Sequence, residues 1–427
     1  MNRRFISGIL MAFVAVGAYA QSGTNSPYSQ YGIGLLTDQS QGFNRGMNGV
    51  GLGMRRGNVV NTLNPASYSA VDSLTMIFDV GLSGQLTNFK EGSTRVNANN
   101  ADFEYFASSF RLRKNVGMAF GLLPYSNVGY EYSTSTYLDS TNGTIAESYT
   151  GSGGLHQAFL GAGWRIAKPL SVGVNVAYLW GTINRTVASG ATTNINSLSK
   201  VYTTTINNYN LEFGLQWNQS FGGKDDVTLG ATVGVGHKLG ADPTCEIINI
   251  NSTVSESDTT KLVAHDGLSL PMTYGVGLAW NHNQKWLVGA DFAMQKWGSI
   301  DLPAYDSQYN TYAQRAGLTK DRYKVNMGAD YVPSPVSRRL FDRIHYRFGA
   351  GYATPYYKIN GQDGPKELSI SAGLGIPLQN AWSNRSVLNI SVQWAHTSAK
   401  DLIVENTFRI NVGLTFNERW FAKWRVD

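Results

Sequence analysis

Alternation of apolar and polar residues constrains this chain more than any other feature of its sequence. Residues 408–416 show it clearly, with an apolar side chain at every second position: Phe408, Ile410, Val412, Leu414 and Phe416. Because side chains along a strand point to opposite faces in turn, this stretch has one apolar and one polar face. The pattern recurs in 211–217, 227–235, 274–280 and 388–394. It predicts strands that lie between lipid and a polar interior.

The first 20 residues have the three parts of a secretory signal peptide. Arg3 and Arg4 give a positive start, and residues 5–17 form an apolar core too short to span a bilayer. Residues 18–20 read Ala-Tyr-Ala, an A-x-A cleavage site. We therefore expect residues 1–20 to be removed on export.

The alternating segments number about fourteen, an even count as expected for a bacterial barrel. They lie near residues 74–90, 101–114, 116–138, 144–166, 170–188, 200–222, 225–250, 261–281, 285–298, 323–333, 345–360, 366–379, 386–400 and 402–417. A soluble β-sandwich would also alternate, but its outward face would be polar, whereas here one face carries Leu, Val, Ile, Phe and Trp. The sequence predicts an all-β fold, a transmembrane antiparallel β-barrel over 74–417.

Connections between these segments alternate in length. Tight turns at 114–115, 167–169, 222–225 and 281–284 alternate with longer polar links near 91–100, 189–199, 251–260 and 299–322. Short periplasmic turns and long external loops are typical of outer-membrane barrels, so both termini are expected in the periplasm. Lys224 and Asn283 then fall in periplasmic turns, and Asn97 and Ser255 in external loops. Residues 418–427 are expected to form a periplasmic tail.

Residues 334–344, SPVSRRLFDRI, are long and basic although their position in the alternation is periplasmic. Two interpretations stay open for them. They form either an ordinary structured turn or a docking surface for another protein.

Composition excludes several function classes. No apolar stretch after the signal is long enough for a transmembrane helix. A single cysteine, Cys245, excludes an intramolecular disulfide, and the six histidines show no metal-binding spacing. Basic residues are scattered, so no nucleic-acid partner is expected. We identify no catalytic residues, no metal site and no cofactor.

Residues 21–73 do not alternate and are rich in glycine and small residues. They include 45–53, RGMNGVGLG, and Asn64-Pro65-Ala66 shortly before the first strand. So few large apolar residues could hardly fold alone, but they could pack inside a wide lumen. An Asn-Pro-Ala triplet in such a segment, followed by about fourteen strands, resembles the outer-membrane long-chain fatty acid transporters of the FadL/TodX type. The resemblance implies that residues 21–73 are a hatch plugging the barrel, with Asn64, Pro65 and Ala66 inside it.

A proline interrupts the third predicted strand at Leu123-Pro124-Tyr125. Proline lacks the N–H that a central strand needs, and a closed barrel has no edge, so a bulge or kink is expected. In the resembled family the third strand kinks inward and opens a lateral gap for apolar substrates. The alternative is a proline at the strand end near the membrane interface.

Ionisable residues recur at positions that face the lumen, where they avoid the cost of contact with lipid. They are Asp79, Arg111, Arg165, Glu212, Asp291, Asp330, Arg347 and Arg409. We expect them to form a charge network that holds the hatch, with Arg45, Arg55 and Arg56 as partners. Alternatively, they form a polar gate that breaks when the hatch moves.

The leading hypothesis is an outer-membrane channel for passive uptake of hydrophobic compounds such as long-chain fatty acids, gated by the hatch and not an enzyme. Its expected partners are outer-membrane lipids and hydrophobic small molecules. One alternative is a non-transporting barrel subunit that binds other outer-membrane proteins; a lumen without an apolar pocket would favour it. A membrane-embedded enzyme is the second alternative and would need a Ser/His pair on the wall.

Overall fold

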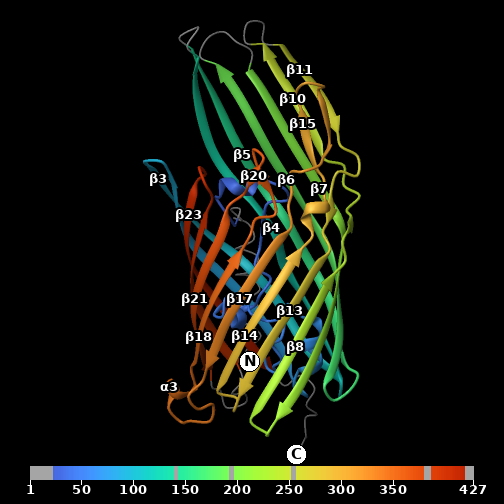
Figure 1. The fold of residues 1–427 in the computed structure, drawn as a ribbon, viewed down its shortest axis with the longest axis vertical. Helices are drawn as coiled ribbons and strands as arrows, with labels where there is room; N and C mark the ends of the chain where they lie inside the picture. The colour runs from blue at the N-terminus through green and yellow to red at the C-terminus, as the bar shows by residue number, and fades with distance from the viewer. Residues whose placement is uncertain (1–22, 139–142, 192–196, 252–255, 379–385, 419–427) are drawn as a thin grey trace, which may run out of the picture.

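The computed structural model is a closed, antiparallel β-barrel with its long axis vertical in Figure 1. It describes residues 23–138, 143–191, 197–251, 256–378 and 386–418. The predicted signal peptide, Ser255 and all but the first residue of the predicted tail therefore lie outside the described residues. The first wall strand pairs with the last, from Met76↔Glu418 to Lys90↔Val404, and this pairing closes the wall.

Fourteen strands form this wall, as the alternation predicted. In order around the barrel they are β2 (Met76–Glu91), β3 (Thr94–Arg113), β4 (Val116–Leu138), β5 (Gly143–Arg165), β6 (Leu170–Ala191), β7 (Ser197–Phe221), β8 (Asp225–Gly234), β13 (Thr273–His282), β14 (Trp286–Gln295), β17 (Arg322–Tyr331), β18 (His345–Ala353), β21 (Lys366–Leu378), β22 (Ser386–Ser398) and β23 (Val404–Glu418). The predicted all-β barrel is confirmed.

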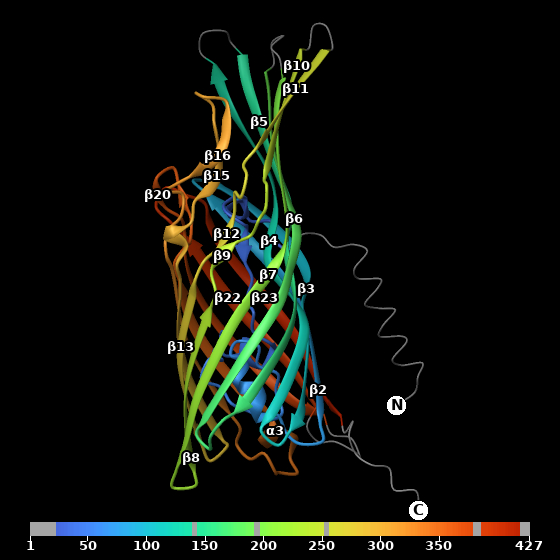
Figure 2. The ribbon, with the colours of Figure 1, turned by 90° about the vertical axis from the view of Figure 1, so that its right-hand side faces the viewer.

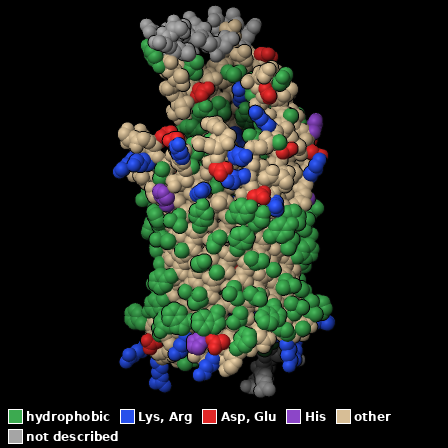
Figure 3. All heavy atoms as spheres, in the orientation of Figure 1, with side chains coloured by type: hydrophobic (Ala, Val, Ile, Leu, Met, Phe, Trp, Pro, Cys, Tyr) green, Lys and Arg blue, Asp and Glu red, His purple; other side chains and the backbone are tan. Residues whose placement is uncertain are grey.

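The outer face of the wall is apolar in a broad band. Figure 3 shows hydrophobic side chains gathered around the middle of the barrel, with charged side chains above and below them. Leu278 and Trp280 on β13 are 46% and 42% exposed, while the intervening Ala279 is buried. Such a band is stable only against hydrocarbon, so the barrel spans a membrane. Among the described residues, no helix has the length and apolar character needed to cross a bilayer.

One end of the barrel has short turns, and the other has long connections. We call them the short-turn end and the long-loop end. Lys224 and Asn283 lie together at the short-turn end, where the Asn283 N–H donates to the Lys224 carbonyl at 2.7 Å. The 334–344 segment lies at the same end and contains the short helix α3 (Leu340–Arg343). Figure 1 shows α3 standing out below the wall.

Several expected boundaries were wrong; the segment 261–281, for example, contributes a wall strand only from Thr273. Residues 91–100 are not a loop: β2 and β3 run on into a hairpin, with Asn97 paired to Asn88 and Gly92 at φ 55° in the turn. The segment 225–250 is broken after Gly234, because Gly240 takes a positive φ and Pro243 cannot donate to a ladder. The segment 345–360 ends as a wall strand at Ala353, just before Pro355.

Shorter elements cover the long-loop end. They are β9 (His237–Lys238), β10 (Thr244–Asn251), β11 (Glu256–Val263), β12 (Ser269–Leu270), η4 (Trp297–Ser299), β15 (Leu302–Asp306), β16 (Thr311–Arg315), β19 (Lys358–Ile359) and β20 (Gln362–Asp363).

On one side, β4 to β7 continue far beyond the other wall strands, and β10 and β11 extend their sheet (Figures 1 and 2). We call this projection the crest. It comprises residues 129–138, 143–152, 184–191 and 197–204, with β10 and β11.

Residues 23–75 pack inside the barrel, where Figure 2 shows them in blue within the wall. We call them the lumenal segment. Their elements are η2 (Pro27–Gln30), β1 (Leu35–Leu36), α2 (Gly42–Arg45) and η3 (Pro65–Ala70). Tyr68 and Val71 join wall residues such as Phe159 in one buried cluster, and Phe43 and Met47 join Leu287 in another. The wall thus supplies the core that this glycine-rich segment lacks.

Candidate functional site

The Asn-Pro-Ala triplet lies against the inner wall and is completely buried at Asn64 and Ala66. Asn64 caps η3: its side-chain oxygen accepts the Ala66 N–H at 3.1 Å. Its Nδ2 donates to the Leu52 carbonyl at 2.9 Å and to the Leu215 carbonyl of β7 at 3.2 Å. Pro65 follows as the first residue of η3, where its missing N–H costs nothing. One asparagine therefore ties together two parts of the lumenal segment and the wall.

Glycines on the inner wall allow this close contact. A Cβ built on Gly173 would come within 2.3 Å of the Pro65 carbonyl carbon, and one on Gly214 within 2.2 Å of the Asn64 Oδ1. The pattern continues around the wall at positions where a Cβ would meet the lumenal segment: Gly117, Gly163, Gly173, Gly214, Gly230, Gly277, Gly328 and Gly349. We call this set the glycine girdle. The backbone of the lumenal segment can approach the wall at these positions because glycine has no side chain there.

A compact ionic cluster fixes the lumenal segment on the opposite wall. Buried Asp330 accepts from Arg56 of the segment at 2.9 Å, from Arg347 at 3.1 Å and pairs with His345 at 2.9 Å. The guanidinium carbons of Arg347 and Arg56 lie 4.0 Å and 4.8 Å from the centre of the Phe43 ring. Because Phe43 belongs to α2, this helix is held between two cations by their attraction to its ring.

Arg45 in α2 makes a second ionic contact with the wall. It pairs with Glu104 of β3 at 2.8 Å and donates to Asn411 of β23 at 2.9 Å. Nearby, Tyr105 donates to Asp79 at 2.9 Å and accepts the Gly42 N–H at 2.6 Å. Asp79 thus reaches the lumenal segment through a tyrosine, not through an arginine.

Asp291 of β14 binds backbone, not a cation. One oxygen accepts the N–H groups of Gly51 and Leu52 at 2.6 and 2.9 Å. On β7, Gln216 donates to the carbonyls of Leu52 and Met54 at 3.1 and 3.0 Å. The glycine-rich turn at 51–54 therefore exchanges hydrogen bonds with two wall strands.

The remaining expected charges do not join one network. Within the described residues, Arg111 and Arg165 form no ion pair, and they lie near the short-turn ends of β3 and β5. Arg409 donates to Gln85 at 2.9 Å and Gln393 at 3.3 Å, and Glu212 accepts from Asn175 at 3.4 Å. Alternation identifies the face of a strand but not the height of a residue along the barrel. Charged residues at different heights were therefore expected to form one network.

The wall has an interruption beside Pro124. The β3–β4 ladder runs from Arg113↔Val116 only to Phe106↔Leu122, beyond which β4 keeps β5 alone as its wall partner. The β4–β5 register shifts between Pro124 and Ser126, so Tyr125 forms a bulge. On the opened side, Thr37 Oγ1 and Gln39 Nε2 donate to the Pro124 carbonyl at 2.6 and 2.7 Å. Leu123 is buried in the cluster that contains Tyr68.

The lumenal segment also adds a strand at this interruption. β1 pairs antiparallel with β4 through Leu35↔Asn127 and Leu36↔Ser126. The Thr37 N–H continues the pairing by donating to the Tyr125 carbonyl at 3.1 Å. The backbone groups that β3 leaves unpaired are therefore satisfied from inside.

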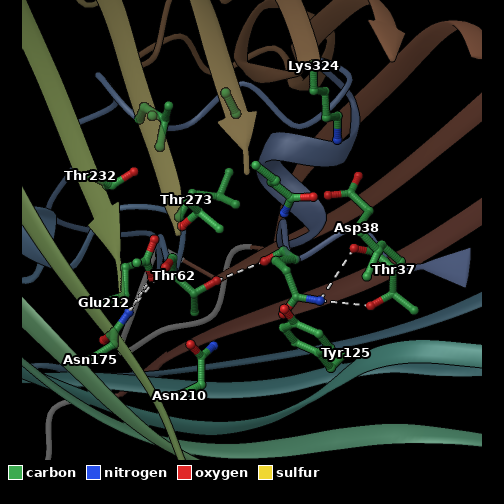
Figure 4. A pocket seen from close by; sticks show the side chains of 18 of the residues that line it. Thr37, Asp38, Thr62, Tyr125, Asn175, Asn210, Glu212, Thr232, Thr273 and Lys324 are labelled. Carbon is green, nitrogen blue, oxygen red and sulfur yellow. Dashed lines mark hydrogen bonds between the residues drawn. The ribbon is translucent and has the colours of Figure 1, made fainter. Parts of the chain in front are cut away.

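A cavity of about 250 Å³ lies between the lumenal segment and the wall beside this interruption. Its lining includes Leu36 and Phe159, but also five charged residues: Asp38, Glu212, Asp291, Arg322 and Lys324. Figure 4 shows Asp38 and Glu212 on opposite sides of it. Burial alone would raise the pKa of Asp38, but nearby Lys324 and Arg45 outweigh this and lower the pKa to about 2. The cavity therefore has a mixed lining, in which charged groups lie beside apolar side chains.

Above the cavity, a buried apolar cluster joins the lumenal segment to the long-loop end. It packs Tyr28 and Ile33 of the segment against Trp297, Tyr356 and Tyr357. Tyr356 accepts the Ile33 N–H at 3.0 Å and donates to the Gly34 carbonyl at 2.6 Å. The segment is thus anchored at both ends of its path.

Sequence reasoning missed the glycine girdle and the pairing of β1 with β4. Glycine does recur at lumenal positions in segment after segment, which is a signal that could have revealed the girdle. Nothing in residues 35–36 marks them as a strand. Within the described residues, no group of three or more His, Cys, Asp or Glu side chains could hold a metal ion.

Comparison with known proteins gives two kinds of match. The sequence profile of the family described as BamG matches residues 1–427, the whole chain. No curated protein matches the sequence.

Among solved structures, the toluene transporter TbuX of Ralstonia pickettii superposes with a TM-score of 0.62 at 15% identity, covering 88% of this chain and 98% of its own. A FadL homologue of Pseudomonas aeruginosa gives 0.63 at 11% identity, covering 90% and 99%. The toluene transporter TodX of P. putida gives 0.60 at 14%, covering 89% and 98%. At such identities the likeness concerns the fold alone.

Proposed function

The chain belongs to the BamG family, and from this premise we propose that it is a non-transporting barrel subunit of a larger outer-membrane protein assembly. The observation that carries the proposal is the fit of the lumenal segment to the wall. The segment touches the glycine girdle with its backbone and makes hydrogen bonds or ion pairs with β3, β7, β14 and β17. The lumenal segment therefore packs inside the barrel in the way that a protein core packs inside a domain.

A transport route would require this segment to move. Displacing it would take Arg56 away from Asp330, remove the Phe43 ring from Arg347 and break the Asn64 hydrogen bonds. Breaking a single buried ion pair already costs about 3–5 kcal/mol. The lumenal cavity places five charged side chains beside its apolar ones, so an apolar molecule there would cover charged groups without giving them a partner. The contacts of the lumenal segment and the lining of the cavity both favour a segment that stays inside the barrel.

We further propose that the short-turn end lies in the periplasm, and that the 334–344 turn contacts a partner there. Val336 is 91% exposed and Phe341 73% exposed. Hydrogen bonds inside the turn fix its shape: Ser334 N–H donates to the Asp342 carbonyl, and Ser337 Oγ to Asp342 Oδ2, at 2.8 and 2.7 Å. A preorganised aromatic residue beside arginines is a common anchor in protein interfaces.

Purification tests the subunit proposal. Tagged protein, extracted from cells in a mild detergent, should elute with the same partner chains at a constant ratio. Phe341→Ser should weaken that association, whereas Tyr309→Ser, at a 70% exposed tyrosine of the long-loop end, should not. Elution of the barrel alone, together with oleate uptake that depends on it, would contradict the proposal.

The wall interruption beside Pro124 favours a second candidate function. A ladder that stops at Phe106↔Leu122 is a place where an apolar compound could leave the barrel sideways into the bilayer. Channel activity for compounds such as long-chain fatty acids would then require the lumenal segment to act as a hatch. Pro124→Val restores a backbone N–H and should slow oleate uptake without changing the amount of folded barrel. Equal uptake with and without the protein would exclude this function.

A further inference from the structure

We propose that a second cavity, between the crest and the connections of the long-loop end, binds an anionic sugar, a compact molecule with a carboxylate or phosphate on a sugar ring. We call it the crest cavity. It is separate from the 334–344 turn, so this binding goes beyond the subunit role. With the short-turn end in the periplasm, as proposed above, the ligand comes from the outer side of the membrane.

The crest cavity has a volume of about 590 Å³ and is formed by parts of the chain that lie far apart in the sequence. The lumenal segment lines it at 30–33, and β6 and β7 line it from the crest. The connections at 302–303, 315–318 and 357–361 form further sides. Figure 3 shows the molecule hollowed near the long-loop end, with Lys and Arg side chains at the edge of the hollow. The volume is that of a site for a small molecule.

All the charged residues that line the crest cavity are cations: Arg185, Arg315 and Lys358. The lumenal cavity differs, because three acidic residues face its two cations. Cations that line one cavity without an anion repel one another and produce a positive potential inside it. A bound anion would remove this repulsion.

Other cations at the long-loop end do have acidic partners. Lys320 pairs with Asp363, and Lys296 pairs with Asp321 at 3.6 Å. Charge pairing is therefore usual at this end, and the crest cavity departs from it.

The three cations of the crest cavity keep donors available for a ligand. Arg185 donates through Nη2 to the Gly32 carbonyl, but its Nε is buried and has no hydrogen-bond partner within the described residues. The side chains of Arg315 and Lys358 form no hydrogen bond or ion pair with any described residue. Guanidinium and ammonium groups in this state suit a carboxylate or phosphate, which they bind through charge-assisted hydrogen bonds.

The neutral residues of the lining fit a sugar ring. Tyr31 and Tyr357 stack with their ring centres 5.2 Å apart, and both line the cavity. Gln30, Thr204 and Asn360 add amide and hydroxyl groups that can bond to sugar hydroxyls.

Apolar side chains, among them Ile183 and Leu318, complete the lining. A sugar ring matches this mixture because it has apolar C–H faces and polar edges. The alkyl chain of a fatty acid would instead cover the polar groups without giving them a hydrogen-bond partner. The combination of cations, tyrosines and neutral polar groups therefore favours an anionic sugar over an anionic lipid chain.

Calorimetric titration of the purified barrel tests this proposal. A polyoxyethylene detergent is used, because its headgroup carries neither sugar nor charge. The probes are digalacturonate and fructose bisphosphate, and their neutral counterparts are the dimethyl ester of digalacturonate and fructose. At least one anionic probe should bind at least about tenfold more tightly than its neutral counterpart. Equal affinities within both pairs of probes would overturn the proposal.

Variants assign the binding to the crest cavity. Arg315→Gln and Lys358→Gln should each weaken binding of the anionic probe by at least about tenfold, because each removes a cation that has no other partner among the described residues. Arg315→Lys keeps the charge and should retain more of the affinity than Arg315→Gln. Lys400→Gln is the matched control, since Lys400 is exposed and lies outside the lining, and it should change the affinity by less than about twofold. Unchanged affinity in Arg315→Gln and Lys358→Gln would overturn the proposal.

Competition identifies the source of the ligand. A phosphorylated glycolipid that displaces the anionic probe would indicate a sugar carried by the membrane, and a glycolipid that does not displace it would indicate a free saccharide. Polyglutamate or oleate binding to the cavity more tightly than both anionic sugars would overturn the proposal, in favour of an acidic protein segment or a fatty acid. Co-elution of partner chains with Arg315→Gln should equal that of the unchanged protein, so failure of sugar binding leaves the subunit role standing.

Discussion

The two halves of β4 are the most instructive comparison in this molecule. Between Val116 and Leu122, β4 is paired on both sides, with β3 and β5, and a Cβ on its Gly117 would overlap the Tyr68 carbonyl of the lumenal segment. Between Glu131 and Thr136, β5 is the only strand among the described residues that pairs with it. The lower half of β4, which we call the internally complete half, thus has a strand on each side, and the lumenal segment packs against it. The upper half, which we call the incomplete half, has one neighbouring strand among the described residues.

The strongest test of the internally complete half is Asp330→Asn. It leaves Arg56 and Arg347 buried without their anion, which should lower the free energy of unfolding by about 3–5 kcal/mol. Thermal unfolding of the purified barrel, followed by its migration on gels, measures this. Asp363→Asn is the control, because its pair with Lys320 is half exposed and worth at most about 1 kcal/mol. Equal losses in the two variants would show that the Asp330 cluster does not hold the segment.

Gly173→Val tests the glycine girdle. The added side chain would overlap the Pro65 backbone, so we expect a loss of about 1–3 kcal/mol and faster trypsin cleavage after Arg55 and Arg56. Gly190→Val is the matched control on the same strand, since no atom lies within 4 Å of its Cβ position. A lumenal segment as resistant to trypsin in Gly173→Val as in the control would refute the close fit.

Asn64→Ala should have a smaller effect. It removes a helix cap and one donor shared by two carbonyls, at a cost of about 1–2 kcal/mol. Asn88→Ala, whose partner Asn97 is exposed, should change stability by less than about 0.5 kcal/mol. Chemical unfolding of both variants measures the two free energies of unfolding, and a larger loss in Asn64→Ala would show that Asn64 stabilises the fold.

The smallest effect is expected in the incomplete half. Ser133→Lys places a charge on an exposed edge, so stability of the isolated barrel should change by less than about 0.5 kcal/mol. A clear loss of stability in chemical unfolding would mean that this edge takes part in the fold.

Much of the wall could be predicted from sequence, because alternation over long segments is a local property. The family resemblance was the reason to expect Asn64 in the lumen, and alternation was the reason to expect Asp330 and Arg347 on the inner face of their strands. The end of the β3–β4 ladder did not, because Pro124 marks an irregularity without saying which neighbour is lost. The pairing of Leu35 and Leu36 depends on that loss, so it exists only in the assembled barrel. Arg111 and Arg165 were expected in one network with Asp330, but they lie apart from it, since height along the barrel is set by register and tilt.

The closing pair of β2 and β23 has a consequence for the order in which this protein folds. Ser26 donates to Glu405 across 379 positions of the chain, and Arg45 to Asn411 across 366. Such distant contacts form only when the last strand is present, and they make closure slow. The lumenal segment precedes every wall strand in the chain, so it is already available when the sheet curls. The wall therefore closes around the lumenal segment. A barrel that closed first would leave no route by which the segment could enter and bond to so many wall strands.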